Sequence, residues 1–252
     1  MTPLELYSQQ PSSTYEAKLH ATMQLLKDVT NHHHPLVQAT SLGVEDMVIT
    51  DLIQKLALPI QISMLDTGCL HKQTLSLKTQ AELHYGISIK VFQPDAKAVL
   101  HFVQENGVDG IFKSPAIRKQ CCHIRKLVPL QALLTGYKGW ITGLRREQSS
   151  FRSNLQEIET ETTQQGTSRI KVNPLIEWTI GDIWHYVEQN SVPYNTLHDE
   201  FFVSIGCEPC TRAIALGEDF RAGRWWWEQE GARECGLHVH ESSSENISLL
   251  NK

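Results

Sequence analysis

Residues 36–46 read LVQATSLGVED: an apolar run, a turn of small residues and the start of a helical pattern. The apolar run predicts a buried strand, and the pattern from Asp46 to Leu56 predicts the helix that follows it. A strand that enters a helix through such a turn exposes backbone N–H groups at the helix N-terminus, where phosphate can bind. Ser41 or Asp46 could equally cap this helix, so the stretch alone leaves both interpretations open.

The alternation of strand and helix continues on both sides of this stretch. Residues 1–30 carry apolar side chains at helical spacing and predict a helical lead-in, whereas residues 154–169 predict a loop or hairpin. Further strands are predicted at 60–65, 87–92, 140–143 and 170–176, and further helices at 70–84, 96–105, 115–135 and 179–190. Strands that alternate with helices predict an α/β fold, in which a mostly parallel sheet has helices on both faces.

Composition and length suit one soluble globular domain. The chain has 252 residues, of which 40% are hydrophobic and 20% charged. No apolar run approaches the roughly 20 residues that a membrane helix needs. The N-terminus lacks the pattern of a secretory signal, so we expect a cytoplasmic protein with reduced thiols. We expect one domain over residues 1–240, with an irregular cysteine-bearing segment at 200–240, and a polar, disordered tail at 241–252.

The charges predict a small anionic ligand. The net charge of −5 argues against a nucleic-acid partner. Arginines nevertheless gather in a few places, among them Arg145, Arg146 and Arg152, and Arg221 with Arg224. Such clusters in an acidic chain are typical of a site for a small, highly charged anion.

Polar motifs follow three of the predicted strands. Besides residues 41–46, Asp66 follows the strand at 60–65, and Arg145 and Arg146 follow the strand at 140–143. The carboxyl ends of parallel strands lie at one edge of a sheet, where ligands bind. Arginines there can bind phosphate or sulfate oxygens with two hydrogen bonds. Asp66 could instead only cap a helix and the arginines could be a solvated run, but three such strand ends favour a binding edge.

Two cysteine pairs, Cys121-Cys122 and Cys207-x-x-Cys210, predict a shared metal site. Zinc holds each sulfur at about 2.3 Å. Adjacent helical residues point about 100° apart, so tandem cysteines converge poorly on one ion. A [4Fe–4S] cluster accepts more widely spaced thiolates and is favoured over zinc or a dithiol redox pair. Lys126, on the same helical face as Cys122, could affect both the cluster and an anionic substrate.

The two remaining cysteines lie apart from these pairs. Cys235 has Arg233 before it and His238 after it, and cationic neighbours favour the reactive thiolate. The residues alone leave open whether Cys235 is a nucleophile or an inert thiol. Cys69 directly follows Gly68 and is interpreted as a partly buried structural thiol.

Four motifs together resemble the assimilatory reductases of adenosine 5′-phosphosulfate (APS) and 3′-phosphoadenosine 5′-phosphosulfate (PAPS). They are KQCCHIRKLVPL at 119–130, GLRREQS at 143–149, GCEPCT at 206–211 and ECGLH at 234–238. The resemblance runs from about Ser41 to His238. It implies the adenine-nucleotide alpha-hydrolase-like fold and a role in sulfate assimilation and cysteine biosynthesis. Because the four cluster cysteines go with the APS-using branch, it implies APS as the substrate, with PAPS as the alternative.

The resemblance also implies roles for individual residues. Cys235 would attack the sulfate sulfur, expel AMP and become an S-sulfocysteine, from which thioredoxin (or glutaredoxin) would release sulfite. The substrate-binding residues expected from the motifs and the resemblance are Ser41, Gly43, Asp66, Lys126, Arg145, Arg146, Arg221, Arg224 and His238. The ligands expected for the [4Fe–4S] cluster are Cys121, Cys122, Cys207 and Cys210.

The chain departs from the family near Cys69. An arginine is expected at this position, and acidic residues are expected where Lys72 and Gln73 stand. An ATP-using enzyme of the same fold is one rival, but it would need a Ser-Gly-Gly-x-Asp-Ser loop that residues 41–46 do not form. The other rival is a non-catalytic iron–sulfur regulator, which would not need Cys235. The sequence leaves open whether the chain forms a homo-oligomer.

Overall fold

A computed structural model describes residues 2–149, 152–163, 166–215 and 217–228. Cys235, His238 and the predicted tail at 241–252 lie outside the described residues. No helix in the described ranges is long and apolar enough to cross a membrane.

The described strands form a six-stranded sheet in the order β3-β2-β1-β4-β6-β5. All neighbours are parallel except β5 and β6, which form an antiparallel hairpin. The strands are β1 (Leu36–Thr40), β2 (Gln61–Leu65), β3 (Lys90–Phe92), β4 (Gly139–Ile141), β5 (Ile158–Thr162) and β6 (Ser168–Val172). The predicted α/β fold with a mostly parallel sheet is confirmed.

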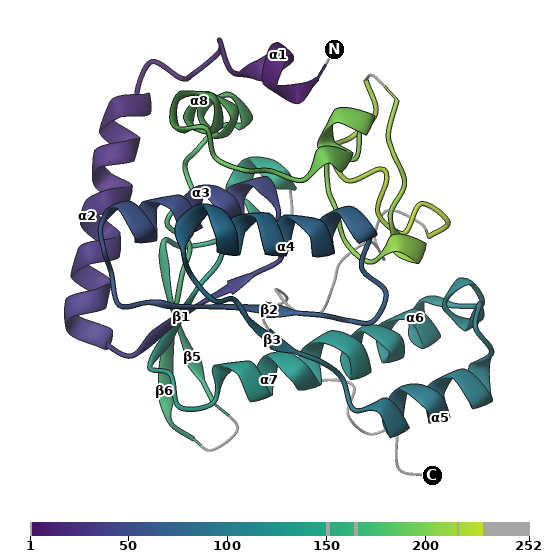
Figure 1. The fold of residues 1–252 in the computed structure, drawn as a ribbon. Coiled ribbons are helices and arrows are strands. Elements are labelled where there is room, and N and C mark those ends of the chain that lie inside the picture. Colours follow the sequence, from purple (N-terminus) through teal and green to yellow (C-terminus); the bar gives the residue numbers. More distant parts are fainter. Residues whose placement is uncertain (1, 150–151, 164–165, 216, 229–252) are drawn as a thin grey trace.

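Helices cover both faces of the sheet (Figure 1). α3 (Val44–Lys55), α4 (Lys72–Tyr85) and α8 (Ile180–Asn190) lie on one face, with α2 (Tyr15–His33) beside them. α7 (Val128–Leu134) packs on the other face, preceded by α5 (Ala96–Asn106) and α6 (Pro115–Cys122). The short α1 (Pro3–Tyr7) contacts α8.

Side-chain alternation along the strands divides the core into two layers. In β1, Leu36 packs into the core beneath α2, α3 and α8, whereas Val37 faces α7. In β4, Ile141 likewise packs into the first of these layers and Trp140 into the layer formed with α7. Successive strand residues point to opposite faces, so a strand that is covered on both sides is apolar at consecutive positions. This explains why two apolar residues, Leu36 and Val37, stand side by side at the start of the 36–46 stretch.

The predicted helix at 115–135 is in fact interrupted. A π-helical turn, His123–Leu127, separates α6 from α7. Pro129 lies in the first turn of α7 and has no N–H to donate to the preceding turn, which accounts for the widened backbone there. The interruption matters because the turn carries Arg125 and Lys126.

The order of the strands creates a crevice. β2 and β3 follow β1 on one side, and β4 lies on its other side. At such a switch point, the connections leaving the two central strands diverge, and ligands bind at their carboxyl ends. The segments that follow β1 and β4 are residues 41–43 and 142–149, the two stretches that sequence analysis singled out.

Candidate active site

A cavity of about 230 Å³ lies at the carboxyl ends of β1, β2 and β4; we call it the cleft. Thr40, Thr67 and Gly143 line it from the strand ends, and residues 203–207 and 220–225 line it from the C-terminal part of the chain. The cleft therefore lies at the switch point of the sheet. Its opposite wall, residues 203–207 and 220–225, follows β2 by more than 130 residues.

Ser41 and Gly43, two of the expected substrate-binding residues, both line the cleft. The backbone N–H and the hydroxyl of Ser41 donate to Asp46 Oδ2 at 2.6 and 2.7 Å. Leu42 adopts a left-handed conformation, with φ at 58°, and its N–H donates to Thr40 Oγ1 at 2.9 Å. The N-cap of α3 is Gly43, which has no side chain to bond the first N–H groups. α3 thus begins at the cleft without a side-chain cap, which suits an anion.

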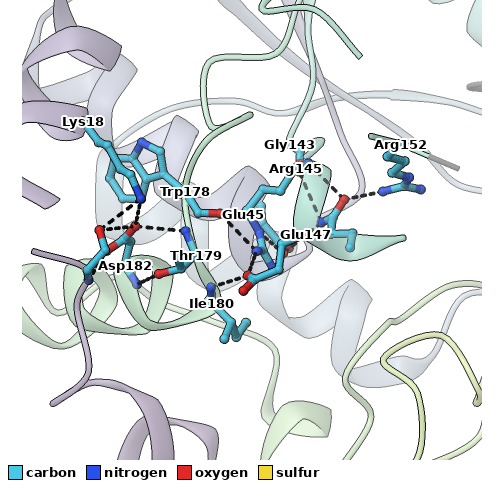
Figure 2. A network of polar contacts seen from close by, with 12 residues as sticks. Lys18, Glu45, Gly143, Arg145, Glu147, Arg152, Trp178, Thr179, Ile180 and Asp182 are labelled. Atoms are coloured by element: carbon cyan, nitrogen blue, oxygen red, sulfur yellow. Dashed lines mark hydrogen bonds and ion pairs between the residues drawn. The ribbon is translucent and has the colours of Figure 1, made fainter. Parts of the chain in front are cut away.

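Arg145 lies beneath the cleft and not in it. Its Nε and Nη2 donate to Glu45 Oε1 at 3.1 and 3.0 Å, and its Nη1 donates to Glu147 Oε2 at 2.6 Å (Figure 2). The residue is only 1% exposed. Burial opposes ionisation of Glu45, but Arg145 and Gln148 outweigh it and hold the pKa of Glu45 below its usual value. Arg145 therefore orients Glu45, which does line the cleft.

Arg146 likewise faces away from the cleft. It pairs with Glu177 and donates from Nε and Nη2 to the Leu155 carbonyl at 3.2 and 3.0 Å. Arg152 lines the cleft instead, 8% exposed and bonded to Gln148. Arg145 and Arg146 were expected to face the anion, but in the structure it is Arg152 that lines the cleft. The clustering of arginines in the sequence included Arg152 but did not distinguish it from Arg145 and Arg146.

Asp66 also does not reach the cleft. Its Oδ1 accepts a hydrogen bond from the Gly68 N–H at 2.9 Å, and its Oδ2 accepts one from Gln93 at 2.8 Å. These bonds close the turn that follows β2. Its neighbour Thr67 lines the cleft. Asp66 therefore shapes the loop that presents Thr67.

His198 is a buried cleft residue that sequence reasoning missed. It lines the cleft from a 3₁₀ helix, Thr196–Glu200, and is 3% exposed. Burial lowers its pKa, even though Glu45 acts in the opposite direction. Its ring packs edge-on against Trp184 at 5.5 Å. A neutral imidazole beside the Glu45 carboxylate adds polarity to the cleft without adding positive charge.

Gly143 is required by the close approach of the segment after β4 to α3. A Cβ atom on Gly143 would lie 2.5 Å from Asp46 Oδ1 and 2.9 Å from Glu45 Cβ. We expect Gly143→Ala to lower the free energy of unfolding by about 1–3 kcal/mol, because overpacking forces the two segments apart. Urea denaturation measures this change. An unfolding free energy equal to that of the wild type would contradict the predicted clash.

Arg221 and Arg224, two more of the expected substrate-binding residues, line the cleft from the C-terminal side. Arg224 lies 4.7 Å from the ring centre of Trp225 and donates from Nη1 to the Ile205 carbonyl at 3.3 Å. The Arg224 N–H donates to the Arg221 carbonyl at 2.8 Å, so the two arginines share one turn. The Trp225 ring provides a rigid surface against which both guanidinium groups are held.

The four predicted metal ligands meet in a second cavity of about 60 Å³, which we call the cysteine pocket. Cys121 and Cys122 come from the end of α6, and Cys207 and Cys210 come from a 3₁₀ helix, Glu208–Cys210, and its N-cap. Cys69 lines the same pocket, although sequence analysis assigned it no part in the metal site. No group of three or more His, Cys, Asp or Glu side chains in the described ranges is arranged to hold a single metal ion.

Burial favours the protonated form of two of the predicted ligands, Cys121 and Cys210. Burial, and then Cys207, raises the pKa of Cys210 to about 12, while Lys126 and Arg224 oppose the shift. Burial also raises the pKa of Cys121, with Arg125 opposing it. A cation that binds thiolates would have to displace these protons.

Lys126 joins the two cavities. It lies in the π-helical turn and lines both the cleft and the cysteine pocket, as do Cys207 and Trp225. The predicted dual role of Lys126 thus has a physical basis: one ammonium group borders both a basic cleft and a group of sulfur atoms.

These features define an α/β protein with an arginine-lined cleft at the switch point of its sheet and a thiol-lined pocket beside it. A sequence model of the phosphoadenosine phosphosulfate reductase domain matches residues 35–213. The chain belongs to this family. It is therefore an enzyme, an oxidoreductase that acts on a sulfur group.

Individual relatives agree with this assignment. The adenosine 5′-phosphosulfate reductase of Allochromatium vinosum is 45% identical over 221 residues, which cover 88% of this chain and 85% of that protein. The enzyme of the same name from Burkholderia cepacia is 44% identical over 223 residues, covering 88% of each. The similarity thus spans most of both relatives.

Solved structures show the same fold. The phosphoadenylyl-sulfate (PAPS) reductase of Candida auris, solved as a phosphate complex, has a TM-score of 0.64 and 26% identity, covering 77% of this chain and 90% of that one. FMN adenylyltransferase of Candida glabrata has a TM-score of 0.54 and 15% identity, covering 95% of this chain and 83% of that one. The second likeness concerns the fold alone.

Proposed function

We propose that the protein reduces APS to sulfite and AMP in sulfate assimilation. The main observation in support is that the two cavities meet at Lys126, which lines both the cleft and the cysteine pocket. The similarity to proteins named adenosine 5′-phosphosulfate reductase supports APS as the substrate. The nucleotide would lie in the cleft, with its phosphosulfate near the start of α3 and the cations Lys126, Arg152, Arg221 and Arg224.

The proposed reaction uses Cys235, which lies outside the described residues. Its thiolate attacks the sulfate sulfur and forms an S–S bond, while the bond between that sulfur and the bridging oxygen breaks and AMP leaves with the electron pair. A thioredoxin thiolate then attacks Cys235 Sγ and releases sulfite. The second thioredoxin thiol frees Cys235 and leaves thioredoxin as a disulfide. The dithiol thus supplies the two electrons that reduce the sulfate sulfur to sulfite.

The residues of the cleft prepare this attack in different ways. Lys126 and the three arginines reduce the negative charge of the phosphosulfate, which would otherwise repel a thiolate. Arg145 holds Glu45 in place, and Gly143 allows α3 to approach the end of β4. His238, outside the described residues, is proposed as a further substrate contact.

We further propose that Cys121, Cys122, Cys207 and Cys210 hold a [4Fe–4S] cluster. The donor set fits this group, because four thiols line one pocket together with Arg118, Arg125 and Lys126. These cations would offset the charge of the thiolates. A cluster spaces its thiolate ligands more widely than a single ion does, which favours it for a set that includes two adjacent cysteines. When bound, the cluster would supply a fixed local charge and a structural cross-link, without itself changing oxidation state.

PAPS is the alternative substrate, because the family model and the Candida auris structure carry its name. Sulfite release with thioredoxin should be measured at matched concentrations of APS and PAPS. We expect a kcat/KM at least about tenfold higher for APS, which corresponds to about 1.4 kcal/mol of transition-state binding. Equal or higher efficiency with PAPS would reject the proposed substrate. Absence of sulfite with either would reject the proposed reaction.

A further inference from the structure

Five cysteines line the cysteine pocket, although the proposed cluster uses four. The fifth, Cys69, comes from the loop after β2, far in sequence from both cysteine pairs. Cys69 packs with Cys121, Cys122, Cys207 and Cys210 against the same group of apolar side chains. Its position in this group calls for an explanation.

The loop that carries Cys69 is attached to the loop that carries Cys207. The Cys69 carbonyl accepts a hydrogen bond from the Glu208 N–H at 2.8 Å, and Leu70 forms an antiparallel bridge with Cys207. The Thr67 hydroxyl lies 3.2 Å from Cys207 Sγ and accepts a bond from the Cys69 N–H at 3.2 Å. Cys69 is thus held beside the predicted ligands by several independent contacts.

The five thiols divide into an inner and an outer group. Cys122, Cys207 and Cys210 are buried, whereas Cys69 and Cys121 are half-buried. Arg125 follows Cys121 by four residues and lines the cysteine pocket, and its Nη1 donates to the carbonyl of Thr67, two residues before Cys69, at 2.6 Å. One arginine therefore connects the two segments that carry the half-buried cysteines.

We propose that Cys69 is a reserve ligand for the outer position of the cluster, which Cys121 occupies in the wild-type protein. The proposal rests on the proposed cluster. When Cys121 is lost, the Cys69 thiol releases its proton to solvent, and its thiolate forms the Fe–S bond that Cys121 would have made. No electron is transferred in this exchange. Among the four predicted ligands only Cys121 matches Cys69 in exposure, so we expect Cys69 to replace Cys121 and not the three buried cysteines.

The test measures iron and acid-labile sulfide per chain after anaerobic reconstitution. Cys121→Ser should retain at least about half of the wild-type iron, whereas Cys69→Ser/Cys121→Ser should retain about a tenth or less. Cys69→Ser alone should retain the full amount. Cys122→Ser and Cys69→Ser/Cys122→Ser form the matched control pair, and both should be iron-poor. Far-UV circular dichroism establishes that each variant is folded.

Alkylation provides a second measurement that does not depend on total iron. With iodoacetamide on the folded, iron-loaded proteins, mass spectrometry should find Cys69 modified in the wild type and protected in Cys121→Ser. Equal iron loss in Cys121→Ser and the double variant, or equal labelling of Cys69 in both proteins, would overturn the proposal. Iron loss in Cys69→Ser alone would make Cys69 an essential residue and not a reserve one. Wild-type protein without iron or sulfide would instead reject the cluster itself.

Discussion

Replacement of Cys235 by serine is expected to abolish sulfite release from APS while leaving the iron content unchanged. The thiol is the proposed nucleophile, and a serine hydroxyl is far less ionised and cannot form an S–S bond with the sulfate sulfur of APS. The loss in kcat should be on the order of 10³-fold or more, as expected when the group that forms the covalent intermediate is removed. Steady-state sulfite formation with thioredoxin measures this loss.

Two further measurements separate a catalytic role from a structural one. AMP binding by calorimetry should be close to wild type in Cys235→Ser, because the cleft residues are unchanged. Wild-type protein incubated with APS but without thioredoxin should carry a sulfo group on the peptide that contains Cys235. Ser242→Ala, seven positions later, is the control and should keep full turnover. Retained sulfite release in Cys235→Ser would contradict the nucleophile assignment.

Replacement of Arg118 by methionine is expected to lower the free energy of unfolding by about 3–5 kcal/mol. Arg118 has no exposed surface, and its Nε and Nη2 donate to Glu228 at 2.9 and 2.7 Å. It also stacks over Trp225, with 4.5 Å between the guanidinium carbon and the ring centre. Methionine fills similar space but leaves the Glu228 carboxylate buried without its cation, which is the main source of the loss.

An exposed ion pair provides the control for this prediction. Arg212 and Glu218 form a two-bond pair like that of Arg118, but their side chains are 38% and 34% exposed. Arg212→Met should therefore lower the unfolding free energy by no more than about 1 kcal/mol. The double variant Arg118→Met/Glu228→Leu should recover most of the loss, because no buried charge remains. Urea denaturation with equal losses in Arg118→Met and Arg212→Met would contradict the argument.

The Arg118 pair also connects the last described residues to the cysteine pocket. Arg118 lines the pocket on α6, and Glu228 ends the described part of the chain. Cys235 follows Glu228 by seven residues. We therefore expect Arg118→Met to reduce iron retention as well as stability, since the pair holds Trp225 against the pocket that it lines.

Local patterns in the sequence were sufficient for the fold class and for the edge of the sheet that carries the site. The apolar run at 36–40 predicted β1, and the small-residue turn after it predicted the cleft loop that Ser41 and Gly43 form. Such features depend on neighbouring residues, whose spacing is set by strand and helix geometry. The pairing of Cys121-Cys122 with Cys207-x-x-Cys210 was also predictable, because the thiols share a chemistry that few other roles require.

Tertiary structure alone decided which of the polar residues face the cleft. Arg145 and Arg152 belong to one arginine-rich segment, yet Arg145 is buried against Glu45 and Arg152 lines the cleft. Arg145 turns away from the cleft because the Glu45 carboxylate on α3 lies beside it. The spacing of residues within 143–152 contains no information about the position of α3. Cys69 is a second example. Its neighbours in sequence gave it no chemical role, and only the contacts between its loop and Cys207 bring it to the other four cysteines.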